Sequence, residues 1–282
     1  MVKFRGFGTL AYYTKKFLEE HGYQVYLGAW CDIHKDGRLV CDFQIGHWTM
    51  YRPPRRCRLS ILWCTTEGNI SPEAKRWLRG YDYIFAQSKF VQQKLEEIDV
   101  HSELMYVGID TEMFRPLHTK KIFDVISVGI YEGPNDDRKF MHKVQEVCFP
   151  LTCYIHTRPT CDYEDMPLLY NMAKVFLTLS GCEGFNIPCL ESMACGLPIV
   201  GNDAPAFNEF AVGILVKPKR VYERIIGHSF LIHEPDFEKI REELHKLFKN
   251  EARIRELGMK AREKALEFDY RKTMKPLLEV LP

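Results

Sequence analysis

Two glutamates separated by seven residues, Glu183 and Glu191, mark the segment of this chain in which a ligand-binding or catalytic site is most readily expected. Glu183 follows an apolar run at residues 175–179, which predicts a buried strand. A helix is predicted to begin at Pro188 and to end at Gly196, which places Glu191 in its first turn. Open α/β sheets bind ligands in such a loop between strand and helix, because free backbone N–H groups there attract anions. A carboxylate at this place can also accept hydrogen bonds from the hydroxyls of a ribose.

The spacing of the two glutamates also has a simpler interpretation, which is favoured when the spacing is taken alone. Glu191 would only complement the helix dipole, and Glu183 would be a solvated loop charge. Two cations, Arg138 and Lys139, open another predicted helix, and such pairs are ordinarily surface charges. Residue types and spacing therefore leave the chemistry of this stretch open.

Apolar runs and helical patterns alternate along the chain, which predicts a parallel α/β protein. Strands are predicted at residues 23–27, 41–45, 59–63, 81–86, 104–107, 123–129, 151–156, 175–179, 197–200 and 213–217. The chain after residue 217 is predicted to be helical, because apolar side chains recur there at helical spacing.

Polar residues follow two of the predicted strands. His47 comes after the run at residues 41–45, and Thr66 and Glu67 come after the run at 59–63. The ends of parallel strands line the ligand cleft of such a sheet, although His47 is equally well explained as a hydrogen-bonded structural residue.

A glycine loop stands near the N-terminus. Gly6 and Gly8 precede Thr9, which is predicted to cap the following helix. Such a loop can cradle a phosphate, but a tight turn explains the two glycines more simply.

The amino-acid composition excludes several classes of function. The chain has 282 residues, 46% of them apolar, and a net charge of +1, so a buried core is expected and nucleic-acid binding is not. No apolar run of membrane-spanning length and no signal peptide are recognisable, which predicts a soluble, cytoplasmic protein. The basic residues 52–58 leave peripheral membrane contact open, with a solvated loop favoured. The ten cysteines contain no C-x-x-C pair; most are expected to be small buried side chains, and their disulfide state stays open.

Residues 183–200, EGFNIPCLESMACGLPIV, resemble the donor-site signature of family 4 of the retaining GT-B glycosyltransferases, the glycosyl transferases group 1 type. That signature has two glutamates separated by seven residues, in a setting such as E-G-F-G-[LI]-P-x-L-E-A-M-A-C-G-x-P-V-V. Asn186 stands where glycine is usual, and Ser192 where alanine is usual. Further similarity at residues 84–117 and from residue 268 onward extends the resemblance over most of the chain, as a compact member of the family.

The resemblance implies a GT-B fold, in which two Rossmann-like parallel-sheet domains face each other across a cleft. An acceptor-side domain would span residues 1–117 and a nucleotide-sugar-binding domain residues 118–267, with a helix at 268–282 crossing back onto the first domain. The implied activity moves a sugar from a nucleotide-sugar, such as a UDP- or GDP-sugar, to a glycan, lipid or protein acceptor with retention at the anomeric carbon. It implies no cofactor and no metal.

The resemblance also implies roles for individual residues. Lys139 matches a lysine that contacts the donor diphosphate, and Arg138 would replace the arginine that is missing after Gly129. Glu183 would hold hydroxyls of the donor sugar, and Glu191 would bind the ribose. The catalytic candidates are Glu183, Lys139 and Arg138. The donor site would comprise Gly8, Gly129, Arg138, Lys139, Glu183, Gly184, Phe185, Asn186, Ile187 and Glu191, and the acceptor side would comprise His47, Thr66 and Glu67.

Two departures from the family pattern keep an alternative open. The arginine expected after Gly129 is absent, and Thr66 and Glu67 stand near the place of a histidine that contacts the transferred sugar. The alternative is a catalytically inactive protein that binds a nucleotide-sugar or a glycan on the same fold. A nicotinamide dehydrogenase ranks below both, because no G-x-G-x-x-G follows a first strand.

Overall fold

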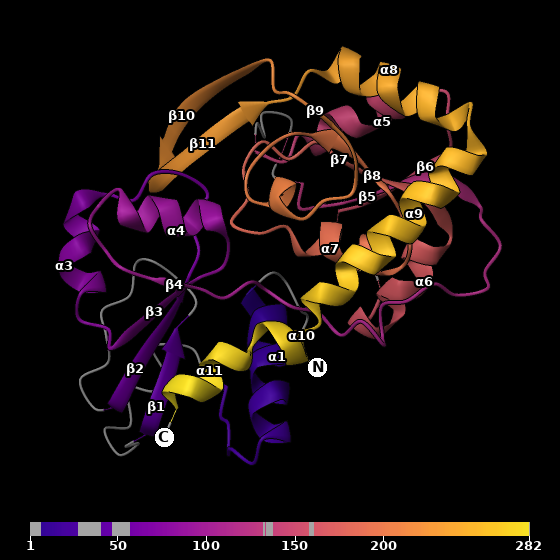
Figure 1. The fold of residues 1–282 in the computed structure, drawn as a ribbon. Helices are drawn as coiled ribbons and strands as arrows, with labels where there is room; N and C mark the ends of the chain where they lie inside the picture. The colour runs from indigo at the N-terminus through magenta and orange to yellow at the C-terminus, as the bar shows by residue number, and fades with distance from the viewer. Residues whose placement is uncertain are drawn as a thin grey trace. The chain divides into compact units, whose positions relative to one another are not determined.

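The computed structural model of this chain describes residues 7–27, 41–46, 57–131, 133, 138–157 and 161–281. They form two compact units (Figure 1). The first unit comprises Met1–Thr66, Ile70–Gly108 and Tyr270–Pro282, and the second comprises Glu67–Asn69 and Ile109–Asp269. The chain passes between the units at Gly108, whereas the sequence places the domain boundary at residue 117; that domain assignment stays a prediction.

The first unit is built on a four-stranded sheet with the order β1-β2-β3-β4, in which every pair is parallel. Its strands are β1 (Cys41–Gly46), β2 (Cys57–Cys64), β3 (Tyr83–Ala86) and β4 (Glu103–Leu104). Its helices are α1 (Phe7–Glu20), η1 (Pro72–Ala74), α3 (Lys75–Leu78), α4 (Lys89–Glu96), α10 (Tyr270–Thr273) and α11 (Lys275–Val280).

Local sequence signals explain how this unit is held together. Ser88 caps α4, as predicted, because its hydroxyl accepts a hydrogen bond from the Val91 N–H at 3.2 Å. Leu62 of β2 packs in one apolar cluster with Val91 and Leu95 of α4. The apolar face of the helix therefore covers the sheet, as its helical periodicity requires.

The second unit is built on a five-stranded parallel sheet with the order β6-β5-β7-β8-β9. Its strands are β5 (Phe123–Val128), β6 (Cys153–His156), β7 (Ala173–Thr178), β8 (Ile199–Asn202) and β9 (Gly213–Val216). Its helices are η2 (Met141–Lys143), α5 (Val144–Cys148), η3 (Tyr163–Asp165), α6 (Met166–Asn171), α7 (Ile187–Ala194), η4 (Phe207–Glu209), α8 (Phe237–Phe248), α9 (Glu251–Ala265) and η5 (Leu266–Phe268). The two sheets confirm the predicted parallel α/β class.

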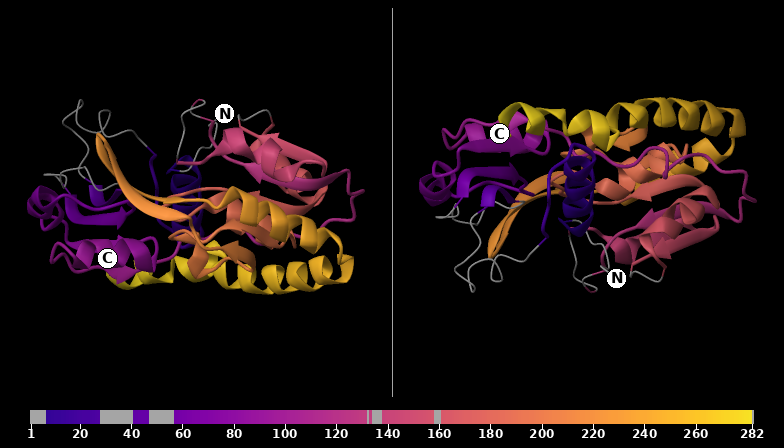
Figure 2. Two further views of the ribbon diagram at one scale, coloured as in Figure 1. Left: turned by 90° about the horizontal axis from the view of Figure 1, so that it is seen from above. Right: turned by 90° about the horizontal axis from the view of Figure 1, so that it is seen from below.

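The core of the second unit lies between its sheet and its helices. Val125, Val175 and Val200 come from three neighbouring strands and join Ile240 and Leu244 of α8 in one buried cluster. Figure 2 shows α8 and α9 running along one side of this unit. Parallel strands are covered in this way, which is why they appear in the sequence as continuous apolar runs.

An antiparallel hairpin corrects the prediction that the chain after residue 217 is helical. Strands β10 (Arg220–Ile226) and β11 (His228–Glu234) pair with each other and extend away from the main sheet (Figure 1). Gly227 joins them with a φ of +72°, a conformation that glycine adopts at little cost. Exposed Val221 and Ile225 alternate with less exposed residues along β10, so the period is that of a strand.

Two predictions near the N-terminus were also wrong. Residues 23–27 form no strand, since Tyr26 and Leu27 are exposed and no strand in the described part of the chain pairs with them. The first helix already begins at Phe7, so Thr9 lies within it and is not its cap. Gly6 and His47 lie outside the described residues.

The cysteines that the structure describes are free thiols, and five of these seven are buried. This confirms, for that part of the chain, the prediction that most cysteines act as small buried side chains. Among the described residues, no helix combines the length and apolar character needed to cross a bilayer.

Candidate functional site

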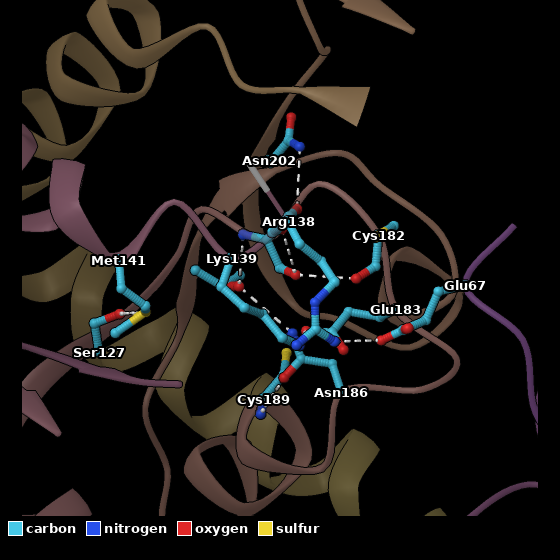
Figure 3. Close-up of polar contacts among 12 residues, drawn as sticks. Glu67, Ser127, Arg138, Lys139, Met141, Cys182, Glu183, Asn186, Cys189 and Asn202 are labelled. Carbon is cyan, nitrogen blue, oxygen red and sulfur yellow. Dashed lines mark hydrogen bonds and ion pairs between the residues drawn. The ribbon is translucent and has the colours of Figure 1, made fainter. Parts of the chain in front are cut away.

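The loops that follow β5 and β7 meet at one edge of the sheet in the second unit. The two strands pair in parallel, so their carboxyl ends point the same way. Lys139, in the loop after β5, forms an ion pair with Glu183, in the loop after β7, although they lie 44 residues apart in sequence (Figure 3). The Gly181 N–H donates to the Arg138 carbonyl at 2.7 Å, which fixes one loop backbone to the other.

A second ion pair lies beside the first. Arg138 donates through one guanidinium nitrogen to Glu67 Oε1 at 2.7 Å. The exposed fractions of the side chains are 18% for Arg138 and 21% for Glu67, against 16% for Lys139 and 9% for Glu183. Two cations and two carboxylates are thus gathered in a region of limited solvent access, where electrostatic interactions are stronger than at an open surface.

Glu67 is held in its charged form by these neighbours. Burial alone would raise the pKa of Glu67, but a hydrogen bond with His228 and the charges of Arg138 and Lys139 outweigh it and lower that pKa. The His228 Nε2 atom lies 3.6 Å from Glu67 Oε2. The sequence assigned Glu67 to the acceptor side, and the structure pairs it with Arg138, one of the two diphosphate-binding candidates.

The two cations lie in a turn, which corrects the prediction that they open a helix. Regular structure begins only at Met141, after Phe140 adopts a left-handed φ of +51°. Such a backbone angle cannot continue a right-handed helix, and buried Phe140 packs against Phe237 with ring centroids 5.5 Å apart. The turn leaves Arg138 and Lys139 directed toward Glu67 and Glu183 (Figure 3).

Asn186 explains one departure from the family signature. Its φ of +79° lies in the left-handed region, where glycine is favoured and asparagine is the next best residue. Its side chain accepts from the Cys189 N–H at 3.2 Å and donates to Thr178 Oγ1 at 3.4 Å. The asparagine therefore keeps the backbone shape that glycine would provide and also caps α7.

Glu191 lies one residue further into α7 than predicted. Because Asn186 is the cap and Ile187 the first helical residue, Glu191 is beyond the first turn. Its carboxylate is buried and accepts from the hydroxyls of Tyr163 at 2.6 Å and Tyr170 at 2.8 Å. Burial raises the pKa of Glu191 to about 7, and the two phenol hydrogen bonds offset only part of that effect.

We expect this carboxyl group to make stability depend on pH. The folded-state pKa of about 7 lies above the ordinary value of 4.5, so the stabilisation by protonated Glu191 is full below pH 4.5 and is lost as the pH rises through 7. The difference corresponds to about 3 kcal/mol. Urea unfolding between pH 5 and pH 8 should show this loss in the wild type and not in Glu191→Gln. Parallel pH profiles of the two proteins would rule the effect out.

The remaining donor-site candidates, and Thr66 of the acceptor side, lie partly in the second unit and partly in the first. Phe185 stacks on Phe210 with centroids 4.7 Å apart, next to buried Gly184, and Ile187 opens α7. The Gly129 N–H donates to the His156 carbonyl at 3.0 Å. In the first unit, Gly8 lies within α1, not in a loop before it, and buried Thr66 follows β2.

Sequence reasoning missed three residues that contact this site. Tyr163 and Tyr170 precede the signature and bind Glu191, and His228 comes from the hairpin that was not expected. The signal for the hairpin is the enrichment of β-branched and aromatic residues on both sides of Gly227. Within the described ranges, no group of three or more His, Cys, Asp or Glu side chains is arranged to hold a metal ion.

Parts of this chain are similar to known proteins. Residues 155–265 match the family described as Glycosyl transferases group 1. A protein of Sulfolobus islandicus filamentous virus named as glycosyltransferase 48 is 35% identical over 117 residues, or 39% of this chain and 37% of that protein. Glycosyltransferase 41 of the same virus is 27% identical over 206 residues, or 68% of this chain and 62% of that protein. The matched part of the chain thus spans less than two thirds of the length of either relative.

Solved structures show the fold. Sucrose-phosphate synthase from Thermosynechococcus elongatus aligns with a TM-score of 0.65 at 13% identity, over 98% of this chain and 79% of that one. HepE of Anabaena, determined in complex with UDP-glucose, aligns with a TM-score of 0.59 at 14% identity, over 79% and 72%. The chain therefore has the GT-B fold, and its residues 155–265 are similar to the Glycosyl transferases group 1 family.

Proposed function

We propose that this chain is a retaining glycosyltransferase that moves a sugar from a nucleotide-sugar donor to an acceptor without a metal ion. The observation that carries the proposal is the contact of Lys139 with Glu183 at the carboxyl ends of two adjacent parallel strands. It joins, in space, the two elements that the family uses for the diphosphate and the sugar of the donor. The similarity to group 1 glycosyltransferases over residues 155–265 covers the second of these elements.

The chemical demand of the reaction is a leaving nucleoside diphosphate, which gains negative charge in the transition state. Lys139 and Arg138 supply positive charge for it, and the N-terminus of α7 supplies N–H groups. Because ion pairs already hold both cations in place, little reorganisation is needed when charge develops. In this assignment the protein side chains do the work that a metal ion does in other transferases.

The two glutamates of the signature bind the rest of the donor. Glu183 accepts from hydroxyls of the sugar, and Glu191 accepts from the ribose. Each carboxylate oxygen of Glu191 has a second lone pair beside the one that a tyrosine hydroxyl occupies. The ribose can therefore join Tyr163 and Tyr170 without displacing them.

The acceptor in this proposal is a glycan, a lipid or a protein, bound on the side of His47, Thr66 and Glu67, and the reaction takes place in the cytoplasm. UDP-sugars are the first donors to test, because HepE is known with UDP-glucose bound.

A donor screen tests the proposal. We expect at least one nucleotide-sugar to raise the melting temperature and to be turned over, by transfer or by slow hydrolysis, at the same rate with and without EDTA. Proton NMR of a transfer product should show the anomeric configuration of the donor. Stabilisation by a nucleotide-sugar without any turnover would favour the inactive binding protein instead, and an inverted product would exclude retention.

A further inference from the structure

The segment Glu67–Asn69 belongs to the second unit, because the hairpin holds its backbone. The Leu231 N–H donates to the Glu67 carbonyl at 2.9 Å. A Cβ atom at Gly68 would lie 2.5 Å from the Ser229 carbonyl oxygen, so only glycine fits there. The chain therefore runs in close contact with β11 at this point, and a larger residue would push Glu67 out of place.

Asn69 anchors the other end of the segment. Its N–H donates to the Ser229 hydroxyl at 2.9 Å, and its side-chain amide donates to Glu223 Oε1 at 2.9 Å. Ser229 in turn donates to the same Glu223 oxygen at 2.5 Å. Both strands of the hairpin thus bind the segment. Its backbone is held at Glu67 by Leu231 and at Asn69 by Ser229.

The hairpin also positions the partner of Glu67. The Arg138 guanidinium carbon lies 5.8 Å from the centre of the Phe230 ring, and its nitrogen donates to Glu67. The backbone of Arg138 is bound separately, by Gly181 of the signature loop. The side chain of this cation is therefore held by the hairpin and its backbone by the donor loop.

We propose that Glu67 is an internal competitor for the donor diphosphate: it binds Arg138 while the donor site is empty and gives it up when the diphosphate enters. This inference rests on the proposed function, in which Arg138 and Lys139 bind the diphosphate. A carboxylate and a phosphate offer a guanidinium the same kind of acceptor, so the diphosphate competes with Glu67 for the Arg138 N–H that now donates to this carboxylate. The hairpin holds Glu67 next to Arg138, so Glu67 can compete with the diphosphate without the help of another protein.

An order of binding follows from this exchange. Once the diphosphate has taken Arg138, Glu67 loses its closest cationic partner and keeps His228 beside it. Its oxygen is then available to accept a hydrogen bond from an acceptor hydroxyl. The donor therefore enters first, and its diphosphate frees Glu67 to bind a second ligand.

Calorimetric titration of the full chain with inorganic pyrophosphate, without added metal, tests the competition. Glu67→Gln keeps the shape of the side chain and removes its charge, so pyrophosphate should bind at least about fivefold more tightly than to the wild type. Ser229→Ala leaves every charge in place and loosens the segment, so a smaller gain of about twofold is expected. Glu234→Gln is the matched control, because it removes one charge from the other end of the same hairpin, where Glu234 pairs with exposed Arg220; it should not change the affinity.

The outcomes separate the two proposals. Equal or weaker binding of pyrophosphate to Glu67→Gln, with wild-type folding shown by its melting curve, would overturn the competition and leave the donor site standing. A gain shared by Glu234→Gln would mean that net charge alone controls affinity, which also overturns it. If neither the wild type nor Glu67→Gln binds pyrophosphate or any nucleotide-sugar, the donor site itself is wrong.

Discussion

Replacing Lys139 with alanine should lower the rate of sugar transfer at least about 100-fold, and Glu183→Ala should do the same. Lys139 carries the charge that we assign to the diphosphate, and Glu183 is its partner in the ligand-free protein. Each variant also leaves one member of a largely buried ion pair without its counter-charge, which lowers stability. The measurement is steady-state turnover of the donor identified by the screen, with the melting temperature recorded in parallel.

Lys143→Ala is the matched control for Lys139. It lies four residues further on and forms an ion pair with Glu146 at 2.9 Å, but both side chains are exposed. We expect wild-type turnover from this variant, because exposed pairs contribute little. Normal turnover in both Lys139→Ala and Glu183→Ala would exclude the proposed mechanism.

Replacing Arg262 with alanine should lower the free energy of unfolding by about 3 kcal/mol, because several hydrogen bonds from one charged side chain are lost. One guanidinium nitrogen of Arg262 donates to the carbonyls of Thr111 at 3.0 Å, Phe114 at 2.8 Å and Ala194 at 2.9 Å. It thereby ties helix α9 to the end of α7 and to the segment after Gly108. Without it, partly buried carbonyls lose a charged donor, and urea unfolding should show the cost.

Arg253→Ala on the same helix provides the comparison. Arg253 pairs with Glu256 at 2.7 Å on the exposed face of α9, so its loss should change the unfolding free energy by less than about 0.5 kcal/mol. A similar, small effect from both arginines would mean that water replaces Arg262 at the three carbonyls.

The parallel sheets were predictable because burial dictates their sequence. Strands β5, β7 and β8 are covered on both sides, and continuous apolar runs therefore mark them. The contact between Lys139 and Glu183 could also be anticipated, since loops at the ends of adjacent parallel strands must lie close together. The pattern of apolar residues could not predict the backbone conformation at Phe140, because its positive φ is imposed by packing in the core.

The hairpin and its contacts were not predictable from apolar periodicity at helical spacing. Residues 220–226 combine arginines with exposed isoleucines, and a strand whose one face is open to solvent gives no continuous apolar run. The pairing of Arg138 with Glu67 depends on that hairpin and on residues 71 positions apart. The β-branched and aromatic side chains of Val221, Tyr222 and Ile225, shortly before Gly227, were the available signal.

Because Glu67–Asn69 belongs to the second unit, this unit is not one continuous segment of the chain that could be exchanged by itself. A fragment that spans Ile109–Asp269 would contain the whole main sheet but not the three residues that contact Ser229, Leu231 and Arg138. Exchange of this unit between homologues, in evolution or by recombination in the laboratory, would therefore separate an arginine from its own carboxylate. For such an exchange to succeed, Glu67–Asn69 and the hairpin at residues 220–234 have to come from the same homologue.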